Sequence, residues 1–191
     1  MPHSSAATAL RGTLLSFRGN PFTMPPEEAL YVEEDGLLIL ENGKISHRGP
    51  YTQTRQFLPP NCPVTHYPHC LISAGFIDAH VHYPQLPVIA SWGQELLAWL
   101  KQYVFPIETR FQDKEFAKVI AKSFMAELLR NGTTTAAVYC TVHPQSVDAF
   151  FEESARIGTC MIAGKVLMDR NAPAPLQETA QQGYDLALKQ I

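Results

Sequence analysis

The sequence predicts an α/β protein in which a small β domain over residues 1–70 precedes the first strands and helices of a (β/α)8 TIM-type barrel over residues 71–191. Three observations support this prediction. Short strand-like segments separated by turns fill the first part, strand and helix patterns alternate in the second, and an apolar strand ending in His-x-His joins them. A complete barrel takes about 250 residues, so we expect this chain of 191 residues to hold only the N-terminal half.

The β domain is predicted from apolar segments bounded by turn residues. Prolines at positions 21, 25 and 26 mark a loop after the first segment, and Asn42-Gly43 between two further segments is a strong hairpin signal. The expected strands are 13–17, 31–33, 36–40 and 44–49.

The barrel part is predicted from alternating strand and helix patterns. Its clearest helix begins after the N-cap Asp113 and ends at Asn131-Gly132, with Phe124, Met125, Leu128 and Leu129 in the core. Trp99 is expected to pack in the core, with substrate stacking as the alternative. The expected strands are 71–80, 133–141 and 160–169, and the other expected helices are a short one within 85–103, 144–157 and 176–191.

Composition and charge exclude several classes of protein. The net charge of −3 and the scattered basic residues do not favour a nucleic-acid partner. Residues 1–20 lack the apolar core of a secretory signal, and no apolar run approaches the length of a membrane span. The four cysteines show no Cys-x-x-Cys pairing, so we expect reduced, buried thiols in a cytoplasmic protein.

The strand 71–80 leads into a pair of histidines, His80 and His82. Side chains two residues apart in a strand point to the same face, so both imidazoles can reach one metal ion. Catalysis in a (β/α)8 barrel lies at the C-terminal ends of the strands, which is where this pair falls. Imidazole suits zinc or iron, and the sequence leaves both open.

Five further segments accompany the Gly-Phe-Ile-Asp-Ala-His-Val-His sequence of residues 75–82: 82–85, 95–100, 103–108, 131–136 and 164–171. With them the chain resembles the amidohydrolase superfamily, whose first barrel strand ends in a metal-binding His-x-His. Ala74 stands where the family usually has proline, which removes no ligand. The resemblance implies that residues 1–70 form the N-terminal part of a β-sandwich.

The resemblance also implies an activity, the hydrolytic removal of an amino group from a purine base by a metal-activated water. His80 and His82 would be two ligands of Zn²⁺, or of Fe²⁺, and the segment His82, Tyr83, Pro84 and Gln85 would line the purine pocket. The other ligands and the proton-shuttling glutamate are expected beyond Ile191, so the 191-residue chain alone should be inactive. The full-length protein is expected to be a homodimer.

Two alternatives remain open: an amidohydrolase of another aminopurine, a pyrimidine or a triazine, and a truncated fragment without catalysis. Tyr83-Pro84-Gln85 and residues 165–171 favour the purine branch. Asp78 shares the face of the histidines by strand parity, but a hydrogen-bonding or capping role is expected, because the family's carboxylate ligand comes from a later strand. For His143 a helix-capping or solvated position is favoured over one beside the substrate, and Asp169 is expected either near the site or paired with Arg170.

Overall fold

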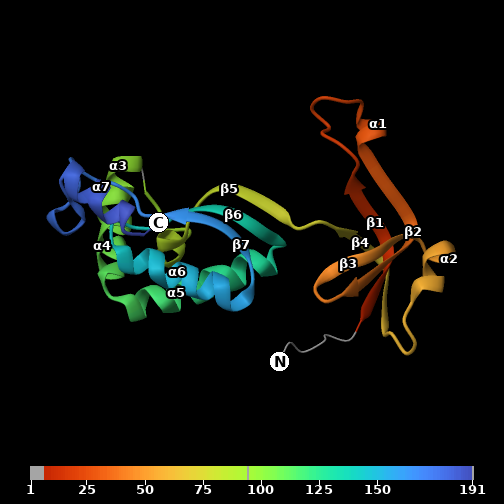
Figure 1. Ribbon diagram of the computed structural model, residues 1–191. Helices are drawn as coiled ribbons and strands as arrows, with labels where there is room; N and C mark the ends of the chain where they lie inside the picture. Colours follow the sequence, from red (N-terminus) through yellow and green to blue (C-terminus); the bar gives the residue numbers. More distant parts are fainter. Residues whose placement is uncertain (1–6, 94, 191) are drawn as a thin grey trace. The chain divides into compact units, whose positions relative to one another are not determined.

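The computed structural model describes residues 7–93 and 95–190, and the chain divides into two units, Met1–Ala74 and Gly75–Ile191. Figure 1 shows a four-stranded sheet in the first unit and a three-stranded parallel sheet with helices in the second. Each unit is described by itself. No helix in the described ranges has both the length and the apolar character needed to span a lipid bilayer.

The sheet of the first unit has the strand order β3-β2-β1-β4. Strand β1 pairs antiparallel with β2 and parallel with β4. The buried side chains of Ala9 in β1 and of Leu37 and Ile39 in β2 form the core of this unit. Within the described residues this unit forms one sheet, so the predicted sandwich stays a prediction. Its elements are β1 (Thr8–Phe17), α1 (Pro26–Ala29), β2 (Leu30–Glu41), β3 (Lys44–Pro50), α2 (Tyr51–Thr54) and β4 (Val64–Ser73).

The two segments predicted as separate strands, 31–33 and 36–40, belong to the single strand β2. An irregularity in the pairing lies between them: Gly12 faces Gly36 and Leu14 faces Glu33, so β2 carries one extra residue at this point. The predicted hairpin at Asn42-Gly43 is present. Both residues have positive φ, 52° and 74°, as a two-residue type I′ turn requires.

The apolar run predicted as one strand over 71–80 is divided between the two units. Leu71 to Ser73 end β4, where Thr13 of β1 faces Leu71, and a new strand, β5 (Phe76–His82), begins after Gly75. The prediction of a single strand was wrong because both pieces are apolar and extended, and local pattern does not show that they pair with different partners.

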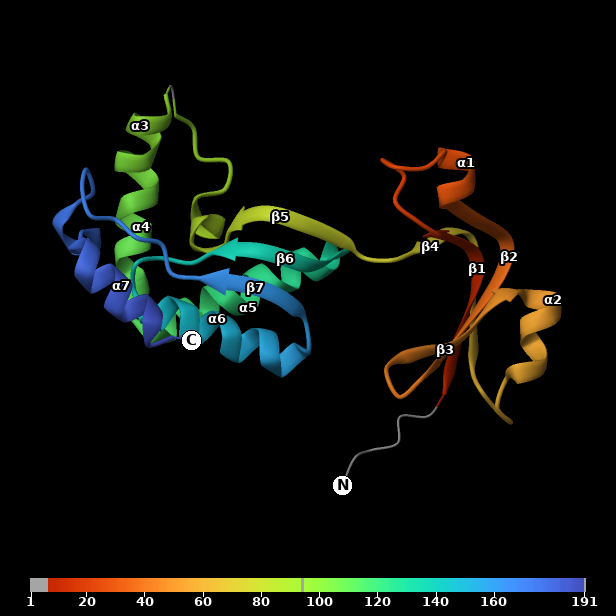
Figure 2. The ribbon, with the colours of Figure 1, turned by 45° about the horizontal axis from the view of Figure 1, so that its top comes forward.

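The second unit is built on the parallel strands β5, β6 (Thr133–Tyr139) and β7 (Cys160–Gly164), in that order. Two helices, α5 (Lys114–Arg130) and α6 (Pro144–Ile157), connect these strands and lie side by side on one face of the sheet (Figure 2). Consecutive parallel strands joined by helices are the repeating unit of a (β/α)8 barrel. The sheet and helices support that architecture, while its closure remains a prediction.

The helices α5 and α6 agree closely with the sequence analysis. The Asp113 side chain caps α5 by accepting from the N–H of Glu115 at 2.9 Å. Phe124 and Met125 are buried as predicted, and Leu128 packs against the core, but Leu129 is 44% exposed. Position 129 lies about 40° around the helix from Met125, at the edge of the buried stripe, where a side chain is partly exposed to solvent.

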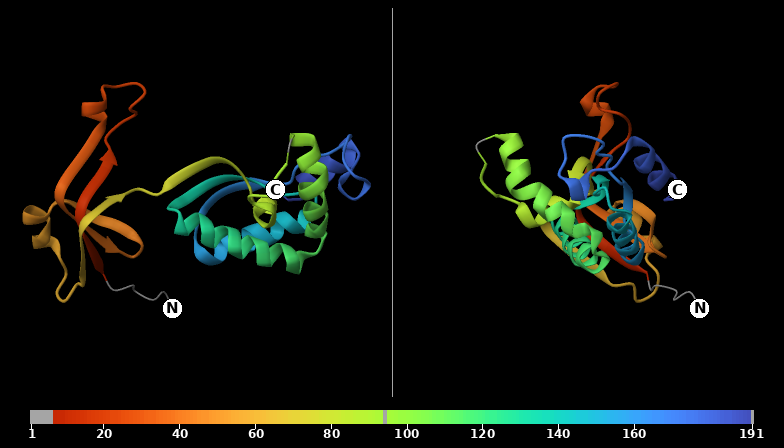
Figure 3. Two further views of the ribbon diagram at one scale, coloured as in Figure 1. Left: turned by 180° about the vertical axis from the view of Figure 1, so that it is seen from behind. Right: turned by 90° about the vertical axis from the view of Figure 1, so that its left-hand side faces the viewer.

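Residues 96–112 form a continuous helical segment that stands at the C-terminal ends of the strands (Figure 3). It contains α3 (Leu96–Trp99), a wide π-type turn over 100–104, α4 (Phe105–Thr109) and a final 3₁₀ turn. Pro106 has no N–H to donate to the preceding turn, and the wide turn before it accommodates this loss. Trp99, expected in the core, is half-buried and donates to Ser91 Oγ at 2.7 Å.

The predicted strand 160–169 ends early, and the predicted helix 176–191 begins late. Strand β7 stops at Gly164, and residues 165–173 leave the sheet as a loop. Helix α7 (Ala180–Leu188) begins at the capping box of Thr179 and Gln182, and Ile191 lies outside the described residues. Glycine at 183 allows the helix to approach Glu178 closely, since a Cβ there would lie 2.9 Å from Glu178 Oε1.

The cysteine prediction was partly wrong. All four cysteines are free thiols, but only Cys140 is buried, Cys62 is half-buried, and Cys70 and Cys160 are exposed. Burial raises the pKa of the Cys140 thiol to about 12, so this side chain behaves as a small apolar core residue.

Tyr83 occupies the centre of the second unit's core. Its ring is fully buried against Phe111, Phe124 and Phe150, and its hydroxyl donates to the Ser146 carbonyl oxygen at 2.6 Å. Burial raises the pKa of this hydroxyl, which keeps it a neutral donor.

We expect Tyr83→Phe to lower the free energy of unfolding by about 1 kcal/mol, because the buried Ser146 carbonyl loses a hydrogen-bond donor while the ring packing is kept. Urea unfolding of the whole protein measures the change. The matched control is Tyr184→Phe, on an exposed ring of α7, which should leave stability unchanged. Equal stability of the two variants would contradict the prediction.

Candidate active site

The carboxyl ends of the three parallel strands lie at one edge of the sheet. His82 at the end of β5 faces Tyr139 at the end of β6, and Tyr139 faces Gly164 at the end of β7. Two hollows open at this edge. The histidine hollow, of about 320 Å³, is lined by His80, His82, Gln85 and apolar side chains. The glutamine hollow, of about 270 Å³, is lined by His82, Gln85, Glu108, Arg170, Asn171 and apolar side chains.

The structure brings the rings of His80 and His82 together. Their centroids are 5.2 Å apart, and the Tyr139 ring lies 4.8 Å from His80 and 4.7 Å from His82. Burial, followed by the charge of His80, lowers the pKa of His82. The neutral imidazole that results is the form that binds a metal ion.

These two histidines fit part of a metal site. Two imidazoles on one hollow are suitable donors for zinc or iron, but a stable site requires three or more protein ligands. Among residues 7–93 and 95–190 no cluster of three or more His, Cys, Asp or Glu side chains is arranged to hold a metal. The pair can therefore supply two ligands of a larger set.

Asp78 shapes the backbone beside the pair. Its carboxylate oxygen accepts from the His80 backbone N–H at 3.0 Å, within an irregular stretch of the β5–β6 pairing between Asp78 and Val81. This is a hydrogen-bonding role of the kind the sequence suggests, directed to the backbone of a histidine.

Of the four residues in the predicted purine-pocket segment, two line the hollows and two do not. His82 and Gln85 line both hollows. The side chains of Tyr83 and Pro84 are buried in the core, so the structure departs from the prediction for these two residues. The strand ends at His82, and the following 3₁₀ turn directs Tyr83 inward, where strand parity no longer applies.

Glu108 is a candidate site residue that the sequence analysis passed over. It lies on α4, is only 3% exposed, and lines the glutamine hollow beside Gln85. Burial raises the pKa of its carboxyl to about 7, and the Gln85 side chain opposes this shift. A single acidic residue among Val104, Phe105 and Ile107 is the signal that could have identified it.

The loop after β7 brings Arg170 and Asn171 to the glutamine hollow. It is anchored at both ends by a buried ion pair, in which Lys165 Nζ lies 2.5 Å from Glu178 Oε1. Asn171 has a φ of +58°, a left-handed conformation that asparagine tolerates better than most residues. The sequence pattern of residues 164–171 therefore corresponds to a structured loop beside the site.

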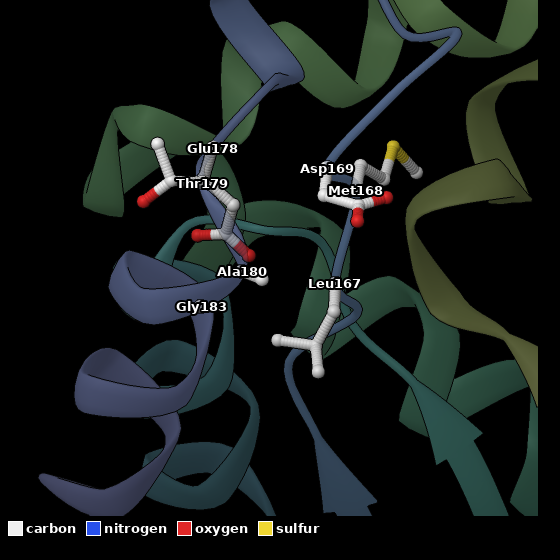
Figure 4. A pocket seen from close by; sticks show the side chains of 7 residues that line it. All are labelled: Leu167, Met168, Asp169, Glu178, Thr179, Ala180 and Gly183. Atoms are coloured by element: carbon white, nitrogen blue, oxygen red, sulfur yellow. The ribbon is translucent and has the colours of Figure 1, made fainter.

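A further hollow of about 230 Å³ lies between this loop and the first turn of α7 (Figure 4). Leu167, Met168, Glu178 and Gly183 line it, together with Asp169, whose carboxylate lies 3.8 Å from the exposed Arg170 guanidinium. Glu178 is paired with Lys165 and Asp169 with Arg170, so both carboxylates of this hollow already have a basic partner. We assign it no ligand.

His143 lies at the N-cap position of α6, but its side chain makes no capping bond. The ring is half-buried, burial lowers its pKa, and its Nε2 is buried without a hydrogen-bond partner among the described residues. The expected capping role is therefore not seen. The Ser146 side chain takes the hydrogen bonds at this helix start, with Thr141 Oγ1 at 2.9 Å and the His143 carbonyl oxygen at 2.8 Å.

Residues 71–190 match the model of the amidohydrolase family, and the chain belongs to this family. Within it, the chain is 48% identical over 162 residues to the guanine deaminase of Escherichia coli (strain K12), covering 83% of this chain and 37% of that protein.

Solved structures extend the likeness to the fold. The E. coli guanine deaminase structure has a TM-score of 0.86 and 43% identity, over 96% of this chain and 42% of that chain. A guanine deaminase from C. acetobutylicum, with guanine bound in its active site, has a TM-score of 0.78 and 25% identity, over 97% of this chain and 42% of that chain. The chain spans about two fifths of the length of these relatives.

Proposed function

We propose that the whole protein is a guanine deaminase, which hydrolyses guanine to xanthine and ammonia. The observation that carries the proposal is the His80–His82 pair, with ring centroids 5.2 Å apart, on a hollow shared with Gln85 at the carboxyl ends of parallel strands. The 48% identity to the E. coli guanine deaminase supports the choice of substrate within the family.

The proposed metal is zinc, with iron as the alternative, held by His80 and His82 together with ligands from beyond Ile191. When bound, the ion would supply a Lewis acid that makes water a nucleophile at neutral pH. The proton-shuttling glutamate is likewise proposed to lie beyond Ile191. The lowered pKa of His82 keeps its ring available as a ligand.

Gln85 is proposed to orient the base. Its side-chain amide is half-buried and carries both a donor and an acceptor, which suits the edge of a purine. The apolar walls of the glutamine hollow, among them Leu100, Val104 and Phe105, exclude water from a flat ring. Arg170 and Asn171 complete the polar lining on the side of the loop.

The test is a comparison of substrates with the whole protein. Ammonia release is followed with guanine, adenine, cytosine and 8-oxoguanine, and xanthine formation is followed separately. We expect guanine to give the highest kcat/KM. Turnover of another of these bases well above guanine would overturn the substrate assignment in favour of a different amidohydrolase, and no turnover of any would favour a non-catalytic protein.

The proposal extends to assembly and location. The whole protein is proposed to be a cytoplasmic homodimer that takes a small purine as its substrate. The four free thiols fit a reducing compartment. Light scattering on the purified whole protein tests the dimer, and a monomeric mass at micromolar concentration would overturn it.

A further inference from the structure

The side chain of Glu108 is unusual in its surroundings. A carboxyl group that is 3% exposed normally has a charged partner or several hydrogen bonds, since burying an unpaired charge is costly. Yet Glu108 Oε2 is buried with no hydrogen-bond partner among the described residues. No described Lys or Arg forms an ion pair with this carboxyl. Core packing alone does not account for an acidic residue at this position.

The location of Glu108 points to a role at the site. It lines the glutamine hollow with Gln85 and His82, on a helix that follows the wide turn over 100–104. The Gln85 side chain lowers the pKa of Glu108 and so favours its ionised form. An amide N–H group that donates a hydrogen bond to a carboxylate has this effect. An amide group that donates to Glu108 is held in one orientation, with its carbonyl oxygen free.

Resting on the proposed function, we propose that Glu108 is a positioning residue that fixes the orientation of the Gln85 amide. Glu108 accepts from the Gln85 NH₂ group, so Gln85 presents its carbonyl oxygen as an acceptor to an N–H of the bound purine. Without this partner the amide rotates between two nearly equivalent orientations, one of which turns its NH₂ group toward the same N–H. Glu108 thus acts on substrate recognition through Gln85.

The experiment is a double-mutant cycle in the whole protein, with the variants Glu108→Met, Gln85→Ala and the two combined. We expect Glu108→Met, which keeps the length of the side chain but has no oxygen acceptor, to raise KM for guanine about tenfold with kcat within about twofold, the pattern of lost binding common to ground and transition states. In the Gln85→Ala background the same change should alter KM less than about twofold, because the two residues act through one contact. The control is Glu115→Gln, on an exposed side chain, which should leave KM unchanged.

Two results would overturn the proposal. The first is a tenfold effect of Glu108→Met that persists in the Gln85→Ala background, since Glu108 would then act without Gln85. The second is a fall in kcat and metal content at unchanged KM, which would indicate a merely structural role.

Thermal unfolding of the same four proteins, without substrate, distinguishes failure of this proposal from failure of the proposed function. Tm shifts of the two single variants that do not add in the double variant support the Glu108–Gln85 contact even if guanine is not the substrate. Shifts that add overturn the contact. Absence of guanine turnover in the unsubstituted protein, with non-additive Tm shifts, overturns the proposed substrate and leaves the contact supported.

Discussion

Replacing His80 or His82 by alanine should lower the metal content of the whole protein at least tenfold and its kcat/KM for guanine about a thousandfold. A thousandfold loss corresponds to about 4 kcal/mol of transition-state stabilisation. The physical reason is the geometry of the pair, whose rings lie 5.2 Å apart on one hollow at the strand ends. Losing one imidazole removes a ligand that the other cannot replace.

Metal content is measured by mass spectrometry of the purified variants, and activity by ammonia release from guanine. The matched control is His69→Ala, which removes an exposed histidine from β4 in the other unit and should change neither quantity. A His80→Ala or His82→Ala variant that keeps both its metal and its turnover would contradict the assignment of the pair.

Glu108 should make the stability of the protein depend on pH in a predictable direction. Burial raises the pKa of its carboxyl from 4.5 to about 7 in the folded state. The folded protein therefore binds more protons than the unfolded chain between these two values, so the stability that Glu108 contributes is fully present below pH 4.5. It is lost progressively as the pH rises toward about 7.

Glu108→Gln removes this titration while keeping the shape of the side chain. Relative to the unsubstituted protein, the variant should gain about 2 to 3 kcal/mol of unfolding free energy between about pH 5 and pH 8. Urea unfolding of both proteins across this range gives the difference, in which the other titrating groups cancel. A difference that stays constant with pH would show that the Glu108 carboxyl is ionised throughout.

Much of the fold could be predicted from local pattern. Helix α6 occupies Pro144–Ile157 and α5 begins after Asp113, as predicted, because capping residues and apolar spacing act within a few residues of each other. The Asn42-Gly43 turn follows from the positive φ that its two positions require. The position of the break after Ser73 could not be predicted, because it depends on which distant strand each apolar segment joins.

The candidate site divides in the same way. The spacing of two residues in a strand was sufficient to pair His80 with His82, and the neighbouring sequence motifs indicated the family. Glu108 lies 23 residues after Gln85 and reaches the same hollow only through the packing of α4 at the strand ends. Tyr83 was expected at the site, but the 3₁₀ turn that follows β5 buries it among three phenylalanines.

The sequence by itself determined the family, the pair of metal-ligating candidates and the order of strands and helices. Each of these depends on patterns among residues that are close together in the chain. Only the tertiary structure decided which side chains surround the pair. Burial and the meeting of Gln85, Glu108 and the loop carrying Arg170 depend on how separate elements pack. An acidic side chain becomes a buried, weakly acidic group only when its neighbours in space exclude water from it.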